Sequence, residues 1–168
     1  MRKKLLGSIF HLTRQSSLSQ ILKDGHIAHN QDARFGLNTS SQNSFGRNRG
    51  YVCLFDFQNI TEEILEDIIR RYYVYSPSWF EEIVGENKVW KLAYLFVDPK
   101  IYDRIIPNEA ASSLILTNEP NRFFIPHAEC WYDGNLPLRY IKKIIKVNVI
   151  LPLTERDRLF LAMGRLRR

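Results

Sequence analysis

The chain has 168 residues, the length of one ordinary domain, and 45% of them are hydrophobic, which is enough to fill a sizeable core. Its 24 Lys and Arg residues exceed its 18 Asp and Glu residues, and the resulting net charge of +6 favours a polyanionic partner. No apolar run reaches the length of a transmembrane helix, and the basic start of the chain lacks the apolar run of a signal peptide. We therefore expect a cytoplasmic protein with no membrane partner, built as a single domain over residues 1–168.

The first expected elements are a strand over residues 8–13 and, directly after it, a helix over residues 16–25. The strand has a β-branched and aromatic composition, and Gly25 is a typical residue to end the helix. This join places His11 and Thr13 at a strand end. Side chains at a strand end border a cleft more often than the middle of a core, although a lone His near an apolar strand is often structural.

Residues 28–50 are polar and rich in Asn, Ser and Gly, with almost no apolar periodicity, so we expect a long loop. The loop carries three arginines, Arg34, Arg47 and Arg49. A basic loop of this kind suits binding to phosphates or to a nucleic-acid backbone. The alternative is a surface loop with no such role.

The middle of the chain alternates strands and short helices. A strand over residues 51–57 precedes a helix over residues 61–71, whose apolar residues fall on one face. Residues 72–84 hold an aromatic cluster, which is more often core packing than a stacking surface. A strand over residues 91–97 and a helical turn over residues 98–106 follow, and a further turn is expected at residues 118–121.

One carboxylate stands out in an apolar stretch over residues 123–132. If this stretch is a strand, Ile125, His127, Glu129 and Trp131 share one face. A carboxylate in such surroundings costs several kcal/mol unless it is paired, hydrogen-bonded or protonated. Glu129 is therefore the first catalytic candidate. The alternative is an edge strand on which Glu129 points into water.

The end of the chain predicts a tight turn at residues 133–135, a helical turn at residues 137–142 and a strand over residues 143–151. An amphipathic basic helix is expected at about residues 154–168. Strands and short helices of this number and order predict an α+β fold.

Five short motifs follow one another along the chain. They are His11-x-Thr13, Leu18-x-x-Ile21-Leu22-x-x-Gly25, Gly50-Tyr-Val-Cys-Leu-Phe-Asp-Phe57, Ala128-Glu129-Cys-Trp and Leu136-Pro-Leu-Arg-Tyr-Ile141. In this order they resemble the DarT-like ADP-ribosyltransferases, prokaryotic toxins that move ADP-ribose from NAD onto bases of single-stranded DNA and that a macrodomain antitoxin opposes. Residues 58–122 match no motif of that family.

The resemblance implies an ADP-ribosyltransferase-like fold of two packed, mostly antiparallel β-sheets with flanking short helices and a NAD cleft. It implies that Glu129 is catalytic and that His11 binds a ribose hydroxyl. The backbone around Leu12 would hold the nicotinamide amide, with Thr13 beside it. Because breaking the bond between nicotinamide and ribose builds positive charge on the sugar, a carboxylate there is worth more in the transition state than in the ground state.

Further residues are candidates for contacts with NAD. Tyr51 is a candidate ring to stack on nicotinamide. The pyrophosphate needs cations, for which the loop offers three candidates: Arg34 as a cofactor-binding residue, and Arg47 and Arg49 as members of the catalytic group.

The sequence thus predicts an ADP-ribosyltransferase that uses NAD as substrate and no metal, and that acts on a nucleic acid, with single-stranded DNA favoured, as a toxin or phage-defence effector. RNA or protein acceptors are alternatives, as is a non-enzymatic, basic nucleic-acid-binding module. A further alternative is a metal site formed by His11, His127 and Glu129, which requires the last two to share a strand face.

Overall fold

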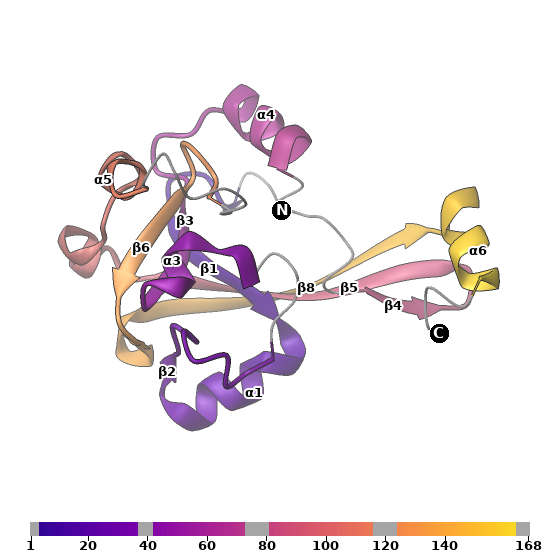
Figure 1. Ribbon diagram of the computed structural model, residues 1–168, viewed down its shortest axis with the longest axis horizontal. Helices are drawn as coiled ribbons and strands as arrows, with labels where there is room; N and C mark the ends of the chain where they lie inside the picture. The colour runs from indigo at the N-terminus through magenta and orange to yellow at the C-terminus, as the bar shows by residue number, and fades with distance from the viewer. Residues whose placement is uncertain (1–3, 37–41, 73–80, 116–123, 164–168) are drawn as a thin grey trace.

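A computed structural model of the chain describes residues 4–36, 42–72, 81–115 and 124–163 (Figure 1). In chain order its elements, with η for 3-10 helices, are β1 Ile9–Arg14, α1 Gln15–Asp24, β2 His26–Ile27, α3 Phe45–Asn48, β3 Tyr51–Asp56, α4 Glu62–Tyr72, β4 Glu81–Val84, β5 Asn87–Val97, η3 Pro99–Arg104, α5 Asn108–Ser113, β6 Glu129–Asp133, β7 Leu136–Pro137, η4 Leu138–Tyr140, β8 Ile141–Pro152 and α6 Glu155–Ala162. The expected α+β class, with antiparallel sheets and short helices, is confirmed.

The main sheet has six antiparallel strands, in the order β4-β5-β1-β3-β6, with β8 on the other edge of β5. The first half of β5 pairs with β4 and its second half pairs with β1, while β8 follows β5 along its whole length. As a result β4, β5 and β8 extend from the body as an arm that carries α6 at its tip (Figure 1). A second, two-stranded sheet is formed by β2 and β7.

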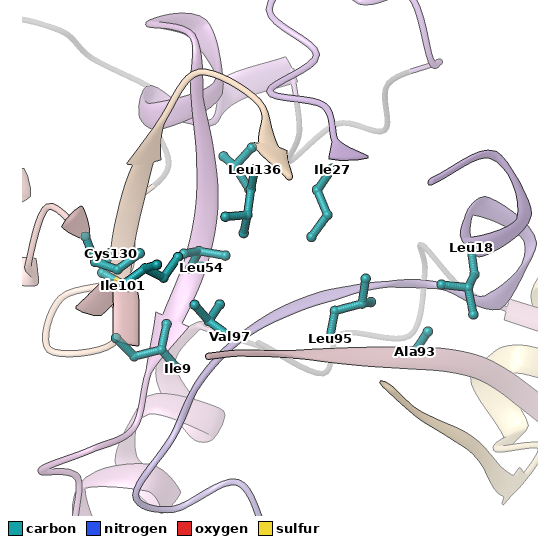
Figure 2. Packing of buried hydrophobic residues seen from close by; sticks show 12 residues of the cluster. Ile9, Leu18, Ile27, Leu54, Ala93, Leu95, Val97, Ile101, Cys130 and Leu136 are labelled. Atoms are coloured by element: carbon teal, nitrogen blue, oxygen red, sulfur yellow. The ribbon is translucent and has the colours of Figure 1, made fainter. Parts of the chain in front are cut away.

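The two sheets pack through a shared apolar cluster. Ile27 of β2 and Leu136 of β7 face Leu54 and Leu95 of the main sheet, and Leu18 of α1 completes this side (Figure 2). Each fully buried side chain of this size contributes about 1.5–3 kcal/mol. The opposite face of the main sheet holds a second cluster, in which residues of α4 pack on aromatic rings from β1 and β5.

Both long predicted helices form within one residue of their expected bounds, although α1 begins at Gln15 without a side-chain cap. Gly25 ends α1 with a positive φ of 71°, a conformation that glycine adopts without steric cost. Thr61 caps α4, because its Oγ1 accepts a hydrogen bond of 3.3 Å from the Ile64 N–H. Leu65 and Ile68 then bury the apolar face of α4 against the sheet.

The strand expected over residues 123–132 is wrong in its first half. β6 begins only at Glu129, and the preceding residues form a turn in which the Ile125 carbonyl accepts from the Glu129 N–H at 2.9 Å. His127 has a φ of 65°, which no strand allows. Ile125 and Ala128 are buried within this turn, so the same apolar residues that suggested a strand are used without one.

Smaller differences concern the loop and the two ends of the arm. The long loop contains α3, and β5 begins four residues before the expected strand, at Asn87. Of the aromatic cluster, residues 73–80 lie outside the described residues, as does the turn expected at residues 118–121. The helix at the end of the chain is α6, which has two acidic and two basic residues and therefore no basic excess, while residues 164–168 are not described. In the part of the chain that the structure covers, the helices are too short or too polar to cross a membrane.

Candidate active site

Glu129 is buried at the start of β6, with only 5% of its surface exposed. Its Oε2 accepts a hydrogen bond of 3.0 Å from the Ile125 N–H, and its Oε1 accepts one of 2.7 Å from the Trp131 Nε1–H. None of the described residues forms a salt bridge with it. The alternative in which Glu129 points into water is therefore wrong, although β6 does lie at the end of the sheet path.

Burial decides the protonation of this carboxyl group. Desolvation raises the pKa of Glu129 to about 7, against the opposing effect of hydrogen bonds from Trp131, Ile125 and Cys53. At neutral pH the group is thus shared between its acid and its base form. A carboxyl in this state can give or take a proton near physiological pH, which is what general acid–base catalysis requires.

A stack of aromatic rings holds the Trp131 donor in place. The Trp131 ring stacks on Phe45 at 5.5 Å and on Tyr51 at 5.3 Å, and Phe124 meets it edge-on at 5.7 Å. Gly46 of α3 lies directly over the indole, since a Cβ at this position would come within 2.6 Å of Trp131 Nε1. Only glycine therefore lets α3 pack here, and α3 covers the side of the sheet on which Trp131 lies.

Cys53 of β3 connects Glu129 to His11. Its thiol donates to the Glu129 carboxylate and lies 3.3 Å from the Ser44 hydroxyl oxygen, while its carbonyl oxygen accepts from His11 Nδ1 at 3.0 Å. Burial, and then the charge of Glu129, raise the pKa of Cys53 well above its usual value. The thiol therefore stays protonated and serves as a hydrogen-bond donor to Glu129.

His11 lies where β1 and β3 separate. These strands pair only at Ile9 and Phe10, whereas the pairing of β1 with β5 continues to Arg14. Because the Cys53 carbonyl can only accept a hydrogen bond, His11 carries a proton on Nδ1. Burial lowers the pKa of His11, so the ring is neutral at pH 7 and its Nε2 is an acceptor.

The separation also leaves a backbone edge on β1. The Phe57 N–H donates to the Ser8 carbonyl at 2.9 Å, so by strand alternation the N–H and C=O of Leu12 also point toward β3. Among the described residues, the ladder between β1 and β3 ends before Leu12. Thr13 follows it on β1, half-buried and paired with Ala93 of β5.

Arg47 holds the loop between α1 and β3 together. Its Nη1 donates to the carbonyls of Asn30 at 2.9 Å and Gln31 at 3.2 Å. Its Nη2 donates to the carbonyl of Gln42 at 3.3 Å and to the side-chain oxygen of Asn48. The guanidinium thus organises the loop from within, a role that the sequence did not indicate.

The other predicted contacts to NAD are Arg49, Tyr51 and Arg34. Arg49 lies over the Phe45 ring at 4.6 Å, and that ring stacks on Trp131, so Arg49 covers the outer side of the aromatic stack. Tyr51 is half-buried in the same stack. Arg34 is exposed, and its guanidinium lies over the ring of its neighbour Phe35, 5.1 Å from the ring centre.

The alternative metal site fails at His127. That residue is exposed in the turn before β6 and does not share a strand face with Glu129. Within the described ranges, no three His, Cys, Asp or Glu side chains come close enough together to hold a metal ion.

Asn108, at the start of α5, supports the site and was missed from the sequence. Its Nδ2 donates to the Glu129 carbonyl at 2.7 Å and to the Ile125 carbonyl at 3.2 Å. Its Oδ1 accepts from the His127 N–H at 2.9 Å. Asn108 therefore fixes the turn that presents the Ile125 N–H to the Glu129 carboxylate. Asn108 is 21 residues from Glu129 in the sequence, and none of the sequence motifs includes it.

Of the residues predicted for the site, Tyr51 and Arg49 lie on the aromatic stack beside Glu129. His11 pairs with Leu95 and therefore points to the other face of the sheet; it is linked to Glu129 only through the carbonyl and the thiol of Cys53. Comparisons of the chain with models of known protein families and with curated proteins found no match.

Proposed function

We propose that the protein transfers ADP-ribose from NAD to a nucleic acid, with single-stranded DNA as the favoured acceptor. The observation that carries this proposal is Glu129: a buried carboxyl with a pKa of about 7 and no cationic partner among the described residues. Such a group is costly to keep unless it has a task. The ordered motifs from His11 to Ile141 supply the reaction class by their resemblance to DarT-like transferases.

The reaction uses the two forms of Glu129 in sequence. The bond between the nicotinamide nitrogen and the ribose carbon breaks, and its electron pair leaves with nicotinamide, which becomes neutral. The ionised carboxylate stabilises the positive charge that develops on the sugar. A nucleophilic atom of the acceptor base then bonds to the sugar carbon, and the carboxylate takes the proton that this atom loses.

The separated edge of β1 suits the nicotinamide end of NAD. A carboxamide has one acceptor oxygen and one donor amino group, and the N–H and the C=O of Leu12 offer the matching donor and acceptor. The neutral His11 can accept a hydrogen bond from a ribose hydroxyl through Nε2. The half-buried Tyr51 is the proposed stacking ring, and Arg34 and Arg49 are the proposed cations for the pyrophosphate. Arg47 then acts by holding their loop.

The biological setting is proposed from the resemblance and from the net charge of +6. A basic chain attracts a polyanion such as nucleic acid. The proposed role is that of a cytoplasmic toxin or phage-defence effector whose action a macrodomain antitoxin reverses. NAD is consumed as the substrate, and the mechanism requires no metal.

The test is to incubate the protein with labelled NAD and, separately, with single-stranded DNA, RNA and cell protein. Label on single-stranded DNA, together with release of nicotinamide, is the expected result. Glu129→Gln should abolish the label, whereas Glu109→Gln, the same change at an exposed position on α5, should not. Label confined to RNA or to protein would replace the proposed acceptor, and no label in any pool would refute the proposal.

A further inference from the structure

Two arginines converge on Tyr140, on the other side of the sheet from Glu129. Arg104 of η3 donates to the Tyr140 hydroxyl at 3.1 Å, and Arg139 of η4 donates to it at 3.3 Å. Both guanidiniums also lie over the Tyr140 ring, at 5.8 Å and 4.9 Å. Two positively charged guanidiniums thus lie against one neutral side chain. Their mutual repulsion disfavours this arrangement, and an anion bound between them would reduce the repulsion.

Two lysines join these arginines where β5 ends and β8 begins. The Asp98 N–H donates to the Tyr140 carbonyl at 2.8 Å, which holds the start of η3 against the start of β8. Lys100 forms a salt bridge of 3.0 Å with Asp98, and hydrogen bonds from Lys100, with a smaller contribution from Lys142, lower the pKa of Asp98. We call the four cations the basic patch: Lys100, Arg104, Arg139 and Lys142.

The positive charge continues from the basic patch along β8. Residues 136–153 include four basic residues, Arg139, Lys142, Lys143 and Lys146, and no Asp or Glu. Lys143 pairs with Phe96 and therefore lies on the opposite face of the sheet, whereas Lys146 pairs with Ala93, which belongs to the same apolar face against which Tyr140 packs. Lys142 and Lys146 are four residues apart on a strand, which corresponds to about 13 Å. A row of cations of this length suits a chain of phosphates better than a single small anion.

The basic patch lies on the other side of the sheet from Glu129. Tyr140 packs on the cluster that contains Cys130, and adjacent strand residues point to opposite faces, so Glu129 belongs to the other side of β6. The patch also differs from the predicted loop, because Arg104 and Arg139 are exposed, whereas Arg47 is bonded to the backbone of its own loop.

We propose that the basic patch is a docking surface for the phosphodiester backbone of a single-stranded nucleic acid. The guanidiniums that now share Tyr140 bind phosphate oxygens, and the lysines neutralise neighbouring phosphates. A strand anchored there can send another part of its length around the molecule toward Glu129. The inference rests on the nucleic-acid partner of the proposed function, but it does not depend on the transfer of ADP-ribose.

The test measures binding of a labelled single-stranded DNA and of an RNA of the same sequence by fluorescence anisotropy at several salt concentrations. Arg104→Gln with Arg139→Gln removes two phosphate contacts. Each contact contributes about 0.7 to the slope of log affinity against log salt, so the double variant should lose about 1.4 in slope and bind about 25-fold more weakly near 0.1 M salt. Arg104→Lys with Arg139→Lys keeps the charge and should retain most of the slope.

A matched control removes two positive charges elsewhere. Arg71→Gln with Lys91→Gln breaks two exposed ion pairs, with Asp67 on α4 and with Glu82 on the arm, and should leave both slope and affinity nearly unchanged. If both double variants lose the same slope and affinity for nucleic acid, the basic patch is refuted as a docking surface, and the loss reflects only the change in net charge.

Other outcomes also decide the matter. If the protein binds nucleic acid and the Arg104→Gln, Arg139→Gln variant binds it equally well, the patch is refuted while the nucleic-acid partner stands. If the protein binds neither DNA nor RNA, both the docking surface and the nucleic-acid partner are refuted. If polyglutamate competes as well as nucleic acid, the surface belongs to acidic polypeptides. A variant that binds less nucleic acid but retains wild-type affinity for NAD supports the separate surface.

Discussion

Replacing Glu129 with glutamine removes a buried titrating group, and the structure predicts how stability then depends on pH. The pKa of Glu129 in the folded protein is about 7, against an ordinary value of 4.5. The folded state therefore binds the proton more tightly than the unfolded state, and Glu129 makes the protein lose stability as pH rises through this range. Glutamine does not titrate.

The size of the effect follows from these two values. Linkage between pKa values of 4.5 and about 7 gives a change of about 2.5 kcal/mol between pH 5 and pH 8 in the free energy of unfolding. The stability of the wild type relative to Glu129→Gln should thus fall by about 2.5 kcal/mol over this range. Taking the difference between the two proteins cancels the contributions of other titrating groups that the substitution leaves unchanged.

Chemical denaturation of both proteins at several pH values measures this difference. The glutamine can offer only one acceptor oxygen to the three donors, Trp131 Nε1–H, the Ile125 N–H and the Cys53 thiol, so its amino group faces at least one of them. This lowers the stability of the variant at every pH and does not change the slope. A stability difference that stays constant from pH 5 to pH 8 would refute a buried Glu129 with a raised pKa.

Three further substitutions test the support of Glu129. Trp131→Phe removes one donor to the carboxylate and should raise the pKa of Glu129 by about one unit, measured by NMR titration of its carboxyl carbon; an unchanged value would show that the indole N–H does not matter. Asn108→Ala leaves the turn before β6 without three hydrogen bonds and should cost about 1–3 kcal/mol in chemical denaturation. Gly46→Ala places a Cβ 2.6 Å from Trp131 Nε1 and should cost about 1–3 kcal/mol, whereas Gly36→Ala, with open space around it, should cost little.

The elements with strong local signals could be predicted from the sequence. The helix ended by Gly25 and the helix capped by Thr61 form as expected, because each has an apolar face and a residue whose chemistry sets its end. The structure of the residues of the 123–132 stretch that precede Glu129 could not be predicted in this way. A turn that buries Ile125 has the same composition as a buried strand, and the positive φ of His127 is a property of the tertiary structure that its residue type does not reveal.

The site was predictable in its central residue and not in its partners. A lone carboxylate among apolar residues pointed to a buried Glu129, and the structure confirms the burial. The hydrogen-bond donors to Glu129 could not be predicted from the sequence, because Cys53 and Asn108 are distant along the chain and come close to Glu129 only in the folded structure. The loop around Arg47 is a similar case, because three of the hydrogen bonds from Arg47 go to backbone carbonyls, whose positions cannot be predicted from residue types.

The most direct test of ADP-ribosyl transfer through Glu129 is a single-turnover measurement with labelled NAD and single-stranded DNA, made on wild type and Glu129→Gln. The binding of NAD to each folded preparation is measured by calorimetry. We predict transfer by the wild type and a loss of roughly 10²–10⁴-fold in the variant, with nearly equal affinity for NAD, because the lost interaction belongs to the transition state. A folded variant that transfers at the wild-type rate, or a wild type that does not bind NAD at millimolar concentration, would contradict the proposed function.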